Sequence, residues 1–164
     1  MKLLRTMRFD GSDDHVFETA APADEWAVSG GFAFADLGED AITGKTKQAF
    51  ANGFLGVPSF GRSTFACVAE ISDDDMDAVA NTMAAHLVER FGAPDVAAAL
   101  PAAREELRFV SDLCDEALIN TVFTVRRTFD DSGEIRESFR TIQPPTDKPL
   151  HSRIWAVVDD EADA

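Results

Sequence analysis

Residues 119–142 constrain the fold most, because they form two alternating segments joined by a tight turn. Asp131-Ser132-Gly133 suits a three-residue hairpin loop in which glycine takes the left-handed position of a bulge. This loop places apolar residues opposite apolar ones and the internal charge opposite its counter-charge. The expected pairs are Phe129 with Ile135, Arg127 with Glu137, Val125 with Phe139, and Phe123 with Thr141. A slip by one residue would oppose mismatched faces, so the pattern predicts a single antiparallel register.

The other face of this hairpin gathers three arginines. Hydroxyl residues oppose them: Ser138 opposes Arg126, Thr128 opposes Arg136, and Thr124 opposes Arg140. Arg126 then lies diagonal to both other arginines, ~7–8 Å away in such ladders. The plainer interpretation is that acidic helices or the acidic tail of the same chain neutralise these three arginines. The functional interpretation is a surface for bidentate recognition of carboxylate or phosphate.

Two more strands are expected near the N-terminus. Residues 3–9 form the first, and residues 15–18 extend it as a short partner. Residues 26–34 alternate large and small side chains, which is typical of a half-buried strand. Within them, Gly30-Gly31 indicates a bulge or a close backbone approach.

The middle and the end of the chain add a loop and two strands. Residues 53–61 are punctuated by glycine and predict a loop. Residues 62–71 form a strand whose expected apolar side is Phe65, Cys67, Ala69 and Ile71. A stiff connector with Pro144, Pro145 and Pro149 precedes a final strand over residues 153–158.

Helical spacing is clearest in Asp73–Phe91. Ser72 is placed as N-cap, three aspartates occupy the first turn where the helix dipole favours negative charge, and Gly92 ends the helix. The expected buried stripe is Met76, Val79, Ala80, Met83, Leu87 and Phe91.

Other helices are expected on both sides of this one. Residues 43–52 predict a helix with Gly53 as its C-cap. Residues 95–100 predict a short helix, and Pro101 then takes the first position of another that runs to about Glu116. The expected buried row of this last helix is Ala103, Leu107, Val110 and Cys114.

Together these elements predict an α+β fold, with a mostly antiparallel sheet of about 5–6 strands and a helical pair packed on one face. The length of 164 residues suits a single domain over 1–164. An acidic, flexible tail is expected from about residue 159.

The charge balance excludes several partners. The formal net charge is -15, from 30 Asp and Glu against 15 Lys and Arg. Coating of nucleic acid needs a net cationic surface, and so does adhesion to anionic membranes. We therefore expect no nucleic acid partner and no membrane partner.

The cysteines and the N-terminus indicate a cytoplasmic protein. Cys67 and Cys114 have no CxxC spacing, so they predict neither a zinc cluster nor a disulfide framework, and we expect two reduced thiols that fill the core. Charged residues interrupt any signal-like apolar segment, and no run is long enough for a membrane helix.

No complete catalytic or metal motif is present in the sequence. Gly44-Lys45-Thr46 resembles the end of a phosphate-binding loop, but the spacing from Gly38 is one residue too long. Residues 56–61 lack the glycine that a nucleophile elbow needs two positions before Ser59. None of the three histidines has a carboxylate at a spacing that indicates a catalytic pair or a metal site. We expect no metal and no cofactor.

Aromatic residues near glycine-rich segments suggest a pocket. Trp26, Phe32, Phe54 and Phe60 surround such segments, and aromatics beside glycine can line a small-molecule site. The plainer interpretation is that they form the core.

Four segments carry a family resemblance: LLRTMRFD, WAVSGGFAFAD, GFLGVPSFGRSTF and HLVERFGAPD. With them the chain resembles a family of small alphaproteobacterial proteins of similar length, a domain of unknown function. The resemblance covers most of the chain and implies an accessory role, without an activity, a ligand or catalytic residues.

The leading hypothesis is a non-catalytic cytoplasmic accessory or binding protein. It would dock an acidic protein surface or a small anion through Arg126, Arg136 and Arg140. The alternative is a small-molecule-binding protein or enzyme with the aromatic pocket. Homodimerisation through the sheet face or an edge strand is a third option.

Overall fold

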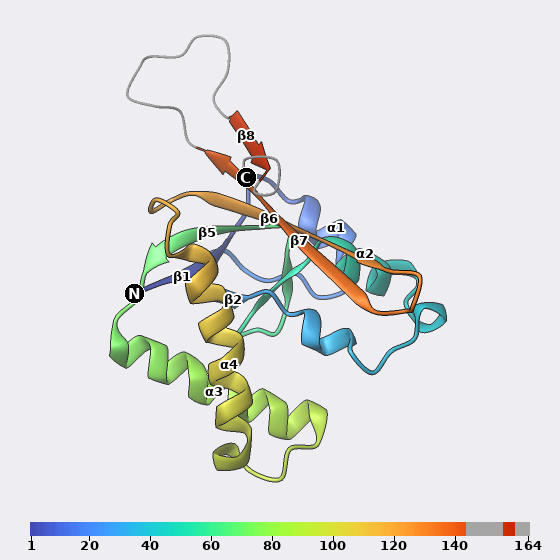
Figure 1. Cartoon of the computed structure of the whole chain (residues 1–164), viewed down its shortest axis with the longest axis horizontal. Coiled ribbons are helices and arrows are strands. Elements are labelled where there is room, and N and C mark those ends of the chain that lie inside the picture. Colours follow the sequence, from blue (N-terminus) through green and yellow to red (C-terminus); the bar gives the residue numbers. More distant parts are fainter. Residues whose placement is uncertain (144–155, 160–164) are drawn as a thin grey trace.

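A computed structural model describes residues 1–143 and 156–159 of the chain. Its strands form one curled antiparallel sheet in the order β4-β3-β2-β1-β5-β6-β7-β8 (Figure 1). The α+β class is confirmed, with eight strands in the described residues instead of five or six. The strands are β1 (Lys2–Met7), β2 (Trp26–Val28), β3 (Phe54–Gly56), β4 (Arg62–Ser63), β5 (Phe65–Glu70), β6 (Val122–Phe129), β7 (Ile135–Gln143) and β8 (Ala156–Asp159).

The predicted hairpin register is confirmed in every pair. Strands β6 and β7 pair Phe129 with Ile135 and Arg127 with Glu137, and the ladder continues to Val122 and Ile142. Gly133 has a φ of +82°, the left-handed conformation that the bulged loop requires. The local turn and the two-residue alternation therefore determine this part of the sheet.

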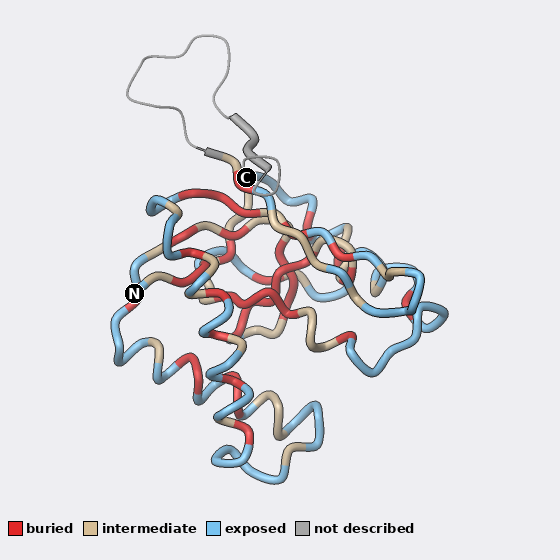
Figure 2. Tube along the Cα trace, viewed as in Figure 1, coloured by how far each residue is buried: buried red, intermediate tan, exposed pale blue. Residues whose placement is uncertain are grey.

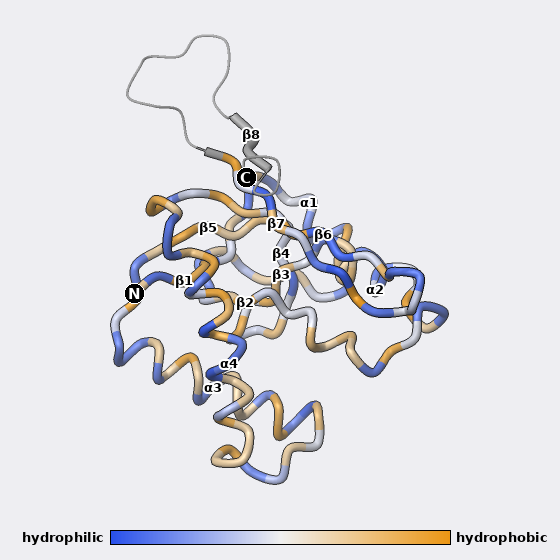
Figure 3. Tube along the Cα trace, in the orientation of Figure 1, coloured by the Kyte–Doolittle hydropathy of each residue, from blue (hydrophilic) through white to orange (hydrophobic). Residues whose placement is uncertain are grey.

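Helices α3 (Asp73–Phe91) and α4 (Val96–Cys114) pack on each other, and α4 packs on β1 and β2 (Figure 1). The Ser72 hydroxyl accepts from the Asp75 N–H, and Gly92 ends α3 at a φ of +78°, as predicted. Hydrophobic and hydrophilic residues alternate along both helices in Figure 3, as expected for helices with one buried face. The predicted stripe of α3 is buried at Val79, Ala80 and Met83, but Phe91 at its end is 43% exposed.

The prediction of two helices around Pro101 was wrong. Residues 96–114 form a single helix, which begins where the Asp95 carboxylate accepts from the Ala98 N–H and continues through Pro101. The fixed φ of Pro101 suits a helix, and its missing N–H costs one hydrogen bond to the preceding turn. The predicted apolar row is confirmed and buried: Ala103, Leu107, Val110 and Cys114.

The N-terminal predictions need two corrections. The predicted strand at residues 15–18 is wrong, because Ser12–Val16 forms the short helix α1. The strand predicted over 26–34 ends at Val28, and Gly31–Phe34 forms a 3-10 helix. Gly30, at a φ of +84°, turns the chain out of the sheet between them.

The middle of the chain also differs from the expectation. The predicted loop 53–61 contains β3, and the strand over 62–71 is divided into β4 and β5. In β5 the buried residues are Ala66 and Val68, on the opposite side from the predicted row. Figure 2 shows the buried residues concentrated where the sheet meets α4. The helix predicted over 43–52 is confirmed as α2 (Gly44–Asn52), which ends at Gly53.

The predicted proline connector, the start of the predicted last strand at residues 153–155, and the tail beyond residue 159 lie outside the described residues. The remainder of that last strand, as β8, pairs with β7 through Arg140 and Asp159.

Candidate functional site

A hollow of about 420 Å³ lies on the face of the β6–β7 hairpin opposite α4. Side chains alternate between the faces of a strand, so the residues that flank the buried Val125 point to this side. We call this site the arginine hollow; its lining is Asn52, Thr64, Phe65, Thr124, Val125, Arg126, Ser138 and Arg140. Among the described side chains, the lining holds two guanidinium groups, three hydroxyls and one amide but no carboxylate, and the Thr64 hydroxyl donates to Asp13 beside it.

The three predicted arginines differ in their surroundings. Arg126 and Arg140 are exposed and line the arginine hollow. Arg140 already has an interaction within the protein. Arg136 lies outside the lining, and its Nε donates to Oδ2 of Asp130 at 2.8 Å. The structure therefore brings two of the arginines together and neutralises the third within the fold.

Asp130 organises the hairpin turn as well as holding Arg136. Its Oδ1 accepts from the N–H and hydroxyl of Ser132 and from the N–H of Glu134. These bonds to the ionised form lower the pKa of Asp130 to about 2, with the Glu134 N–H as the largest cause.

We expect the turn to lose stability in acid. A carboxyl with a lowered folded pKa stabilises the fold above its ordinary value of 3.8, and this contribution disappears as the pH falls toward about 2. Carboxyl ¹³C NMR should give a midpoint near 2 for Asp130. Between pH ~4 and ~2 the free energy of unfolding should fall more steeply than in Asp130→Asn, whereas Asp131→Asn should behave like the parent. A midpoint at the ordinary value would contradict the prediction.

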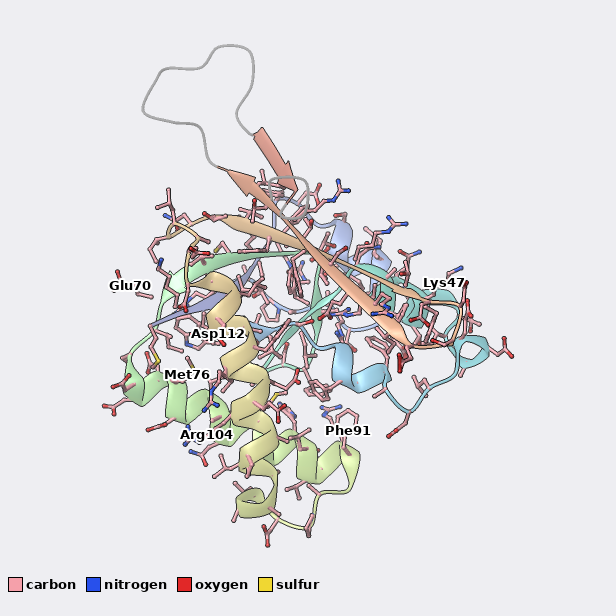
Figure 4. All side chains as sticks on the ribbon, viewed as in Figure 1. Lys47, Glu70, Met76, Phe91, Arg104 and Asp112 are labelled. Atoms are coloured by element: carbon pink, nitrogen blue, oxygen red, sulfur yellow. The ribbon has the colours of Figure 1, made fainter. Side chains whose placement is uncertain are left out.

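The four aromatic residues of the predicted pocket lie in different surroundings. Phe54 is completely buried in the core, and Trp26 is half-buried against it. Phe91 lies at the end of α3 (Figure 4). Phe32 and Phe60 both contact it, with ring centroids 5.5 Å and 6.1 Å away. Of the four, Phe32 also lines a hollow, which is described below.

A buried arginine lies beneath the opposite face of the hairpin, and sequence reasoning did not predict its burial. The Arg127 side chain is 0% exposed, and its Nε donates to Oε2 of Glu137 at 2.7 Å. Its Nη1 donates to the carbonyls of Phe50 at 3.0 Å and Gly53 at 2.9 Å, at the end of α2. Its Nη2 donates to the carbonyl and hydroxyl oxygens of Ser29.

Arg62 is a second buried cation in the same region. Its guanidinium donates to the carbonyls of Gly53 and Gly30, both at 3.2 Å, and stacks over the Phe34 ring. Burial, with the nearby charge of Arg127, lowers the pKa of Arg62 to about 9, so it stays charged at neutral pH. The two arginines therefore tie the end of α2 to residues 29–30.

The chain matches the model of a protein family over residues 1–158, a family of unknown function (DUF6505). It belongs to that family. Searches among curated proteins and solved structures found no match.

The thiols of this DUF6505 member are poorly placed for nucleophilic chemistry. Both cysteines are free; Cys114 is buried and Cys67 half-buried. Burial raises the pKa of Cys114 to about 12 and also raises the pKa of Cys67, so both remain protonated at neutral pH. Cys114 belongs to the hydrophobic core as predicted, whereas Cys67 lies on the side of β5 that faces away from that core.

Two further properties of the DUF6505 chain bear on its partners. Residues 1–143 and 156–159 contain no group of three or more His, Cys, Asp or Glu side chains that could hold a metal ion. No helix in the same part is long and apolar enough to cross a membrane.

Proposed function

We propose that the protein is a non-catalytic accessory protein that binds a small carboxylate or phosphate anion in the arginine hollow. The observation that carries this proposal is the lining of the hollow, in which the described side chains combine two arginines with hydroxyl and amide groups and include no carboxylate. In a chain of net charge -15, this lining brings two cationic side chains together. The two free thiols suit a cytoplasmic location, which is part of the proposal.

The groups in the hollow match the needs of an oxyanion. A guanidinium donates in a planar fork that fits carboxylate and phosphate, and Arg126 is exposed at the surface of the hollow. Hydroxyls of Thr124 and Ser138 lie on the neighbouring strands and can turn their hydrogens toward an acceptor. Among the side chains that the structure describes, the lining has no histidine or carboxylate to take up a proton, and for this reason we favour binding over catalysis.

We expect inorganic phosphate and citrate to shift the backbone amide NMR signals of Thr124 and Ser138 at constant ionic strength. Arg126→Ser should weaken this binding about tenfold or more, because a hydrogen bond to a charged group is lost. Arg136→Ser is the matched control, since Arg136 shares the sheet face but is paired with Asp130 outside the hollow.

Two results would count against the proposal. One is a uniform response of exposed amides to each anion, as expected for general ionic effects. The other is an equal loss of affinity in the Arg126→Ser and Arg136→Ser proteins, which would indicate long-range charge instead of a defined site.

A further inference from the structure

On the α4 side of the hairpin, a second hollow of about 300 Å³ has the opposite character. We call it the glutamate hollow. It lies between α4, the 3-10 helix and β7, and its side-chain lining is Ser29, Phe32, Glu106, Phe109, Ile135 and Glu137. Two carboxylates thus share an open hollow with two phenyl rings and an aliphatic side chain. It does not involve the residues of the arginine hollow.

Glu137 is held in place within the glutamate hollow. Its Oε2 accepts from the buried Arg127 and from the Ser29 hydroxyl. Among the described residues, Oε1 of Glu137 has no hydrogen-bond partner. The Glu137 side chain is 22% exposed. One oxygen of a fixed carboxylate is therefore available to a ligand that donates hydrogen bonds.

Glu106 faces the same hollow from α4 without a hydrogen bond or ion pair within the described part of the chain. Burial raises the pKa of Glu106, and the charges of Glu137 and Glu105 raise it further, although Arg127 opposes them. A cation placed between the two carboxylates would relieve this repulsion.

Exposed apolar residues surround the glutamate hollow. Phe109 is 47% exposed, and Phe91, which contacts Phe32, is 43% exposed. Leu37 is 40% exposed and lines an adjacent hollow that shares Ile135. A small free ligand would leave these side chains in water, whereas the surface of a protein partner would cover them.

We propose that the glutamate hollow receives a lysine side chain of a protein partner. The aliphatic stem would lie against Phe32, Phe109 and Ile135, and the ammonium would donate to Glu106 and the open Oε1 of Glu137. The three donors of an ammonium can be divided between Glu106 and the open Oε1 of Glu137, whereas Glu137 by itself cannot accept the two-pronged fork of an arginine, and we therefore assign the ligand as lysine.

The test uses NMR titration of the intact protein with lysine capped as an acetyl methylamide. Capped norleucine, which has the stem without the ammonium, is the ligand control. Capped lysine should shift the amides of Phe32, Glu106 and Ile135 and bind at least tenfold more tightly than capped norleucine. Glu106→Gln should remove this preference, whereas Glu105→Gln, at the exposed neighbouring position, should keep it.

Equal binding of the two capped amino acids would overturn the proposal, and so would an unchanged preference in Glu106→Gln. The free diamine 1,5-diaminopentane tests the source of the ammonium. Binding of the diamine more than tenfold tighter than capped lysine would overturn the assignment to a protein partner. Weaker or similar binding supports it.

Discussion

Replacing Arg127 with methionine is expected to lower the free energy of unfolding by about 3–5 kcal/mol, the usual cost of removing one partner from a buried ion pair. The variant leaves Glu137 without its cation and the carbonyls of Phe50, Gly53 and Ser29 without their donor. Relief of the repulsion on Arg62 offsets part of this loss. Urea unfolding monitored by circular dichroism measures the difference.

Arg126→Met is the matched control, because it makes the same change one residue earlier on the same strand, at an exposed position. It should change the stability by no more than about 0.5 kcal/mol. Adding Glu137→Leu to Arg127→Met should recover part of the loss, since no half-buried carboxylate then lacks its cation. Equal stability of the Arg127→Met and Arg126→Met proteins would show that the buried arginine does not hold the fold together.

The elements that the sequence predicts well are those determined by residues close to one another in the sequence. The β6–β7 register follows from a three-residue loop and the alternation of its flanks, and α3 follows from a cap at each end. The buried face of β5 was predicted wrongly because both of its sides are largely apolar. Only the packing of α4 on the sheet decides that Ala66 and Val68 face inward.

The candidate sites divide in the same way. Hairpin pairing places Arg126 and Arg140 on one face, and this could be read from the sequence. The burial of Arg127 could not be predicted from local pairing, because its acceptors come from Ser29 and the end of α2, far away in the chain. One signal was available: Arg127 lies in the same alternating row as Val125 and Phe129, so it faces the core side.

Gly30→Ala is expected to destabilise the protein by about 2–5 kcal/mol, the sum of two effects. A left-handed backbone costs a non-glycine residue about 1–2 kcal/mol, and Gly30 has a φ of +84°. Overpacking adds about 1–3 kcal/mol, because the new Cβ would lie 2.6 Å from both Nη1 of Arg62 and Cβ of Leu55.

Gly133→Ala separates these two effects. Gly133 has nearly the same φ, +82°, but a Cβ there meets nothing within 4 Å, so only the backbone cost applies. The excess loss in Gly30→Ala over Gly133→Ala, measured by urea unfolding, therefore reports the steric conflict with the Arg62 guanidinium and Leu55. When the parent protein already carries Arg62→Met, the further change Gly30→Ala should cost less than it does in the protein with Arg62. The reason is that a flexible thioether then replaces the branched guanidinium. Equal losses for the two glycine variants would mean that the chain around Arg62 adjusts without cost, and that the approach of Gly30 to the buried cation does not require glycine.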